Sequence, residues 1–233
     1  MVRKLLLSLL ILCFNFNLAL AGQIIFLRGG GGGGGYLLQD EFEAADGTNI
    51  TAHGWTAIGT DPGDYIEIDT AQKNGGSSSV LIDGNANATE YIVYKSFTQQ
   101  TSGKFTVSVY FRTTDVTTVN QIPIFIIHAS NDDNNANRVA AFYQETNDLS
   151  TIGATLANDV FAINTWYHLE VEFNMDTNKY DVWLNSTEYN NSGNYWAFEQ
   201  NVDPAYIYLQ KRPVSLWDGW VDDLYIYSGA RIP

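Results

Sequence analysis

The chain has 233 residues, 26 acidic and 12 basic side chains, a net charge of −14 at pH 7 and a single cysteine. This acidic balance disfavours binding to nucleic acid, to an anionic membrane or to a polyanionic substrate through charge. The length suits one all-β domain, since such domains often run to about 200–250 residues. Because one cysteine cannot form a disulfide within the chain, the hydrophobic core must stabilise the fold.

Residues 1–21 are typical of a secretory signal peptide. Arg3 and Lys4 form a basic start, an apolar run follows, and Ala19-Leu20-Ala21 offers a small-x-small cleavage site. The apolar run is shorter than the roughly 20 residues that span a membrane as a helix. We therefore expect a secreted, extracellular protein with no membrane span after cleavage.

Residues 22–35 join a short apolar segment to seven consecutive glycines. The apolar residues Ile24, Ile25, Phe26 and Leu27 predict a short strand within 23–28, and the glycines predict a flexible tether because they have no side chains to pack. The strand could pair with its own domain. It could also be donated to a neighbouring molecule, which would support self-association in an extracellular filament or matrix.

From residue 36 to 233 the pattern changes to short alternating strands separated by Asn, Asp and Gly-rich turns. Within 104–111, four apolar residues share one face, and within 166–174 apolar residues again alternate with polar ones. The alternating runs lie at 64–69, 90–95, 104–111 and 166–174. This arrangement predicts an all-β fold, a two-sheet antiparallel β-sandwich (jelly roll).

Three parts of this domain resemble the concanavalin A-like, laminin-G-type jelly rolls. The segment 39–47 is similar to the opening strand of that family, 164–173 with 179–185 to its central hairpin, and 218–227 to its last strand. The resemblance covers nearly all of residues 36–228 and implies the fold. The family includes lectins, adhesion modules, glycoside hydrolases and polysaccharide lyases, so function must be argued from a site.

Two enzyme motifs of the family are present only in part. Glu67-Ile-Asp69-Thr-Ala-Gln72 resembles the Glu-x-Asp-x-x-Glu strand of family-16-type glucanases, but Gln72 cannot donate a proton as an acid. Alginate-lyase-like members of the family abstract a proton with a His and a Tyr, while an Arg and a Gln neutralise the carboxylate of the uronate. Arg112, His128 and Tyr143-Gln144 resemble that set, yet the Gln two residues before His128 and the Arg-rich first motif are missing. A lyase-like enzyme stays an alternative, and a structural role for His128 is the simpler reading.

Sugar binding requires aromatic platforms with polar neighbours, because sugar C–H faces pack on rings while hydroxyls need fixed partners. Trp183 is expected on an outer face, because Tyr180, Val182 and Leu184 take the inward face of its strand. The alternative is that such aromatic rings cover a second small cluster or belong to the core. The candidate carbohydrate-binding residues are Arg112, His128, Tyr143, Trp183, Trp196 and Trp217.

Carboxylates near the two ends of the domain indicate a structural Ca²⁺ site. The resemblance implies that the first and last strands lie close together, so Asp40 or Glu41 could approach Asp222 and Asp223. Hard carboxylate oxygens suit Ca²⁺, which takes about 6–8 oxygen ligands. Alternatively, these carboxylates cap a turn or accept hydrogen bonds from the backbone.

The function predicted from the sequence is a secreted, non-enzymatic module that binds carbohydrate, with a glycan or a cell-surface polysaccharide as its partner. The first alternative is a subunit of an extracellular assembly that donates the strand at 23–28. The second is a polysaccharide lyase-like enzyme.

Overall fold

The computed structural model describes residues 35–58, 66–83, 90–117, 122–190, 196–212 and 218–232. All of them belong to one structural unit, residues 32–233. The predicted signal peptide, the apolar segment at 24–27 and Trp217 lie outside the described residues. Within the described ranges, regular structure is β-strand except for two short 3₁₀ helices, η1 (Ile50–His53) and η2 (Asn135–Asn137). Among these residues, no helix is long and apolar enough to cross a membrane.

The described strands form two antiparallel sheets. Sheet A contains, in spatial order, β13 (Thr187–Glu188), β12 (Lys179–Leu184), β11 (Tyr167–Asn174), β6 (Lys104–Thr113), β16 (Gly219–Ser228), β4 (Ser79–Ile82) and β3 (Ile66–Asp69). Two further strands belong to sheet A: β1 (Tyr36–Asp40) pairs with β16, and β14 (Trp196–Ala197) pairs with β12. Sheet B contains β10 (Ala154–Ala157), β9 (Asp148–Thr151), β8 (Arg138–Glu145), β7 (Ile122–His128), β15 (Tyr206–Lys211), β5 (Tyr91–Ser96) and β2 (Thr56–Ile58).

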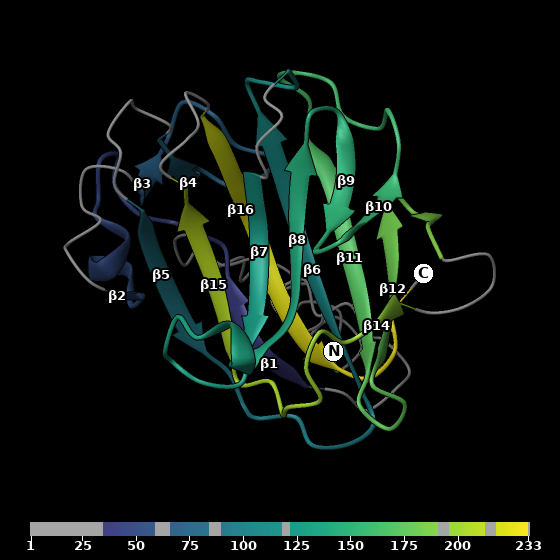
Figure 1. The fold of residues 1–233 in the computed structure, drawn as a ribbon. Helices are drawn as coiled ribbons and strands as arrows, with labels where there is room; N and C mark the ends of the chain where they lie inside the picture. The colour runs from purple at the N-terminus through teal and green to yellow at the C-terminus, as the bar shows by residue number, and fades with distance from the viewer. Residues whose placement is uncertain are drawn as a thin grey trace, which may run out of the picture. The chain divides into compact units, whose positions relative to one another are not determined.

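The two sheets pack face to face as the layers of a β-sandwich (Figure 1). In that view sheet B lies in front of sheet A. This confirms the fold class predicted from the strand pattern.

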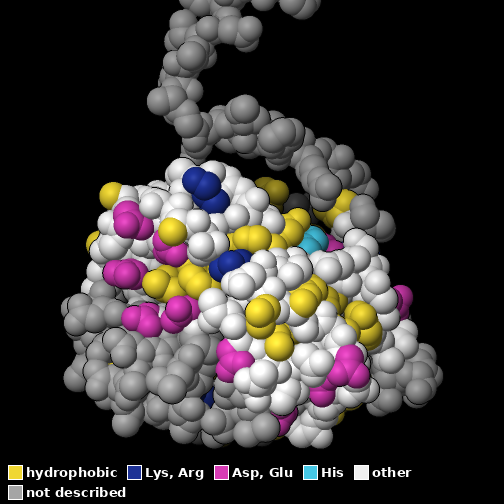
Figure 2. All heavy atoms as spheres, turned by 90° about the horizontal axis from the view of Figure 1, so that it is seen from above, with side chains coloured by type: hydrophobic (Ala, Val, Ile, Leu, Met, Phe, Trp, Pro, Cys, Tyr) yellow, Lys and Arg dark blue, Asp and Glu magenta, His cyan; other side chains and the backbone are white. Residues whose placement is uncertain are grey.

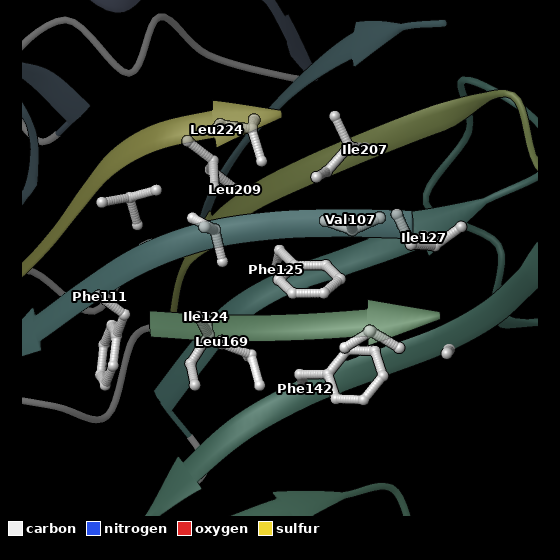
Figure 3. Close-up of a cluster of buried hydrophobic side chains, with 14 of the residues drawn as sticks. Val107, Phe111, Ile124, Phe125, Ile127, Phe142, Leu169, Ile207, Leu209 and Leu224 are labelled. Atoms are coloured by element: carbon white, nitrogen blue, oxygen red, sulfur yellow. The ribbon is translucent and has the colours of Figure 1, made fainter. Parts of the chain in front are cut away.

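The core between the layers follows from the period-2 alternation of the central strands. Phe105, Val107, Val109 and Phe111 of β6 are all buried, as are the alternate residues of β11. Figure 3 shows side chains from both sheets interleaving, among them those of Phe111 and Phe142. Full burial of such a side chain contributes about 1.5–3 kcal/mol relative to its exposure, so this core can stabilise a domain that has no disulfide.

Strand β7 departs from simple alternation in a way that positions His128, one of the candidate binding residues. Its pairing with β8 shifts register between Pro123 and Phe125, so the neighbours Ile124 and Phe125 both face the core. Beyond this irregularity Ile127 faces the core, and Ile126 belongs to a separate cluster on the other side of the strand. The shift therefore places His128 on the outer face of sheet B.

The outer face of sheet A is less exposed than the sequence suggested. Glu170 and Glu172 do point away from the core, but they are only 5% and 9% exposed. Arg231 covers them: its Nε donates to Glu170 over 2.7 Å, and its backbone N–H donates to Glu172 over 2.9 Å. These carboxylates thus lie under the C-terminal segment of the described chain.

Candidate functional site

A second apolar cluster lies on the outer face of sheet B, opposite the main core. Because Ile207 and Leu209 of β15 point into the core, the alternate residues Tyr206, Tyr208 and Gln210 point outward. The cluster contains Ile92, Ile126, Ala141, Tyr143 and Tyr208, with Ile58, Tyr94 and Tyr206 packed against it. We call this surface, together with His128, Ser150 and Gln210, the sheet B face.

Aromatic rings form a continuous row on the sheet B face. The ring of Tyr94 lies 5.6 Å from that of Tyr206, edge to face, and 5.7 Å from that of Tyr208. His128 stacks on Tyr208 with ring centroids 4.4 Å apart and an interplanar angle of 8°. Tyr94 and Tyr206 are half-buried, so each offers part of its ring to solvent. Such rings suit the C–H faces of a sugar.

Polar atoms on the same face have no partner within the described part of the chain. They are Nδ1 of His128, Oη of Tyr143, Oγ of Ser150 and Oε1 of Gln210. All four residues are 5% exposed or less, and Tyr143 and Ser150 lie directly opposite each other in the β8–β9 register. A buried polar atom without a hydrogen bond costs about 1–3 kcal/mol. Four of them on one face therefore indicate donors and acceptors kept for a bound polar molecule or water.

The histidine of the sheet B face is neutral. Burial, together with the positive charge of Arg138, lowers the pKa of His128 to about 4. The imidazole is therefore uncharged at neutral pH. The guanidinium of Arg212 lies 5.0 Å from the ring centroid of Tyr143, and Glu90 accepts a hydrogen bond from Nε2 of Gln210. The face is thus aromatic and hydrogen-bonding in character, with the positive groups of Arg138 and Arg212 near it.

Several solved structures have a similar fold. The cellulose-induced protein Cip1 is 16% identical, with a TM-score of 0.58 over 84% of this chain and 98% of its own. A carbohydrate esterase structure from the Shiga toxin-encoding bacteriophage phi24B is 15% identical, with a TM-score of 0.58 over 85% of this chain and 100% of its own. A sialidase matches at 11% identity and a TM-score of 0.57, and the chain spans 18% of that protein's length.

The two-sheet sandwich has the jelly-roll architecture that the resemblance to concanavalin A-like proteins implies. This confirms the resemblance drawn from the sequence. At these identities the likeness concerns the fold alone. Comparison with models of known protein families and with curated protein sequences gives no match.

The jelly roll separates the residues expected to form a lyase site. His128 and Tyr143 both lie on the sheet B face, on neighbouring strands β7 and β8. Arg112 lies on β6 in sheet A, with its guanidinium 4.7 Å from the Trp220 ring centroid. Gln144 is fully buried and donates to the backbone oxygen of Thr146 over 2.8 Å. Arg112, His128 and Tyr143-Gln144 therefore do not meet in one site, because β6 belongs to sheet A whereas β7 and β8 belong to sheet B.

Two other predicted aromatic residues, Trp183 and Trp196, lie on strands of sheet A. Trp183 points away from the core as expected, and the guanidinium of Arg231 lies 5.0 Å from its ring centroid. Trp196 on β14 packs against the main core, and its indole N–H donates to the backbone oxygen of Tyr189 over 3.2 Å. A role for either in sugar binding stays a prediction, and Trp217 falls outside the described residues.

Asp40, Asp222 and Asp223 do not form one metal-ligand group. Across the described residues there is no cluster of three or more His, Cys, Asp or Glu side chains that could hold a metal ion. Asp40 is buried, and it accepts from Trp55 Nε1 over 2.9 Å and from Lys95 Nζ over 2.7 Å. Asp222 accepts from the backbone N–H of Asn74 over 2.8 Å. A structural Ca²⁺ near Asp40, Asp222 and Asp223 stays a prediction.

Sequence reasoning missed Tyr94, Tyr206, Tyr208, Ser150 and Gln210 as members of the site. Alternation in the segment 206–210 places its two tyrosines and its glutamine on one side, which was a usable signal. The signal was incomplete, because alternation does not say which side of a strand is covered.

Proposed function

We propose that this jelly roll is a secreted carbohydrate-binding module that holds a glycan on the sheet B face. The observation that carries the proposal is a set of four buried polar atoms, without a partner among the described residues, beside a row of aromatic rings. Sugar recognition needs this pairing, since the rings pack on C–H faces while fixed polar groups bond the hydroxyls. The name of the similar phage structure, a carbohydrate esterase, agrees with this class of ligand.

The charge of the molecule favours a neutral glycan over a polyanionic one. The whole chain has a net charge of −14. On the face that Figure 2 shows, Asp and Glu side chains gather toward the edges, while Lys and Arg form only isolated spots. On the sheet B face, the guanidinium of Arg212 lies over the ring of Tyr143, and the carboxylate of Glu90 accepts from Gln210. A polyanionic chain would therefore meet net repulsion at long range.

The test is calorimetric titration of the purified protein with a panel of neutral and acidic oligosaccharides. We expect binding to a neutral member, weakened in Tyr143→Phe, which removes one hydroxyl from the sheet B face. Trp183→Ala is the matched control, because it removes an aromatic ring from the outer face of the other sheet. Binding that survives Tyr143→Phe unchanged but is lost in Trp183→Ala would move the site to sheet A and overturn the assignment.

A further inference from the structure

A serine and a histidine are hydrogen-bonded on the outer face of sheet A, away from the proposed glycan site. Ser108 lies on β6 and His168 on the neighbouring strand β11. Both point outward because Val107, Val109 and Leu169 beside them in sequence face the core. The distance from Ser108 Oγ to His168 Nε2 is 2.8 Å. This is the contact through which an imidazole can take the proton of a nucleophilic hydroxyl.

The imidazole of His168 is held by a stacked ring, and a hydrogen bond fixes the backbone of the same residue. Tyr110, directly opposite in the β6–β11 register, stacks on it with ring centroids 4.4 Å apart and an interplanar angle of 10°. The backbone N–H of His168 donates to Oδ1 of Asn185 over 2.9 Å. A ring fixed in this way keeps Nε2 aimed at the serine hydroxyl, so the nucleophile and its base are oriented before any substrate arrives.

A carboxylate lies on the far side of the imidazole, but it is not bonded to it. Glu170 Oε2 lies 3.9 Å from His168 Nδ1, beyond hydrogen-bond length, and accepts from Arg231 Nε over 2.7 Å. With Ser108 donating to Nε2, the imidazole proton lies on Nδ1, the side that Glu170 occupies. The group is therefore a serine–histidine pair with a nearby ion pair, not a complete triad.

We propose that Ser108 and His168 form a nucleophile–base pair that hydrolyses small acyl esters. The hydroxyl oxygen of Ser108 attacks the carbonyl carbon of the ester while its proton moves to Nε2 of His168. The carbon–oxygen bond to the alcohol then breaks, and the alcohol leaves with that proton. Water, activated by the same imidazole, cleaves the acyl-serine, which releases the carboxylic acid and restores Ser108.

Burial limits the size of the acyl group. Ser108 is 8% exposed, and Tyr110 and His168 lie together beside it on the same face. A long acyl chain would have to displace these rings, so acetyl and other short acyl esters are the substrate class that fits. Glu170 lies directly opposite Ser108 in register and is bonded to Arg231, so the guanidinium offsets the negative charge of the carboxylate beside the serine.

The test is covalent labelling of the purified protein with a fluorophosphonate probe, read by intact mass and peptide mapping. We expect one label on Ser108, no label in Ser108→Ala, and at least about 100-fold slower labelling in His168→Asn, since general-base catalysis contributes about 10²–10⁴-fold. The matched control is Ser79→Ala, because Ser79 is a buried strand serine of the same sheet that bonds only a backbone oxygen, that of Gln72. That variant should label at the wild-type rate.

Hydrolysis of p-nitrophenyl acetate provides a second readout on the same variants. We expect the Ser108→Ala rate to fall at least about 100-fold, to the level of the uncatalysed reaction, with an unchanged melting temperature that shows the fold is intact. Wild-type protein that is neither labelled nor faster than Ser108→Ala would overturn the proposal. A label that persists in Ser108→Ala would also overturn it.

Discussion

Two buried tyrosines of the sheet B face offer a paired test of the site, because only one hydroxyl has a protein partner. Tyr143 and Tyr208 are 0% and 1% exposed and belong to the same cluster. The hydroxyl of Tyr208 lies 2.6 Å from the backbone oxygen of Ser130 and 2.9 Å from that of Asp132, and donates to them. The hydroxyl of Tyr143 has no hydrogen-bond partner among the described residues.

Replacing each tyrosine by phenylalanine should shift stability in opposite directions. Tyr143→Phe removes an unsatisfied buried group and should raise the free energy of unfolding by up to about 1–3 kcal/mol. Tyr208→Phe loses a satisfied hydrogen bond and should lower it by about 0.5–1.5 kcal/mol. In a domain of this size, 1 kcal/mol changes Tm by about 2–4 °C. The expected changes are therefore a rise of up to about 12 °C and a fall of about 1–6 °C.

Urea denaturation and thermal melting of the two variants measure these changes, and calorimetry with the bound glycan completes the test. Because Tyr143→Phe removes one hydrogen bond to the ligand, its affinity should fall about 2–13-fold while stability does not. If Tyr143→Phe loses as much stability as Tyr208→Phe, the Tyr143 hydroxyl has a partner in the folded protein. In that case the reasoning that assigns this face to a glycan is wrong.

Three further predictions concern other parts of the fold. Asp40→Ala should lower the free energy of unfolding by about 3–5 kcal/mol in urea, because it leaves the buried Trp55 N–H and the Lys95 ammonium without their acceptor; a loss below about 1 kcal/mol would contradict this. The pKa of His128 is about 4 in the folded protein against 6.5 ordinarily, so the folded state binds fewer protons between these values. Stability should therefore fall as pH drops from 6.5 to about 4, and the slope should flatten in His128→Asn; equal slopes would argue against the shift. If Ca²⁺ binds near Asp222, excess Ca²⁺ should raise Tm and a chelator should reverse the rise, whereas identical melting curves would exclude it.

Local alternation was enough to predict the sandwich and much of its core. The inward faces of 104–111 and 166–174 are buried as expected, and Trp183 lies opposite the inward Tyr180, Val182 and Leu184. The period of 2 is a property of the strand itself, because successive side chains point to opposite faces. Where apolar and polar residues alternate clearly, the sequence therefore determines which residues face the core before any strand pairing is known.

The sites depended on long-range pairing, which alternation does not encode. Arg112 and His128 lie on successive strands in sequence, yet β6 and β7 belong to different sheets. Ser108 and His168 are 60 residues apart and meet because β6 pairs with β11. The sequence by itself determined that each strand has one side facing the core and one facing outward, and that the inward sides form a shared core. Only the tertiary structure decided which outward faces meet, because pairing and register are set by the packing of the whole sandwich.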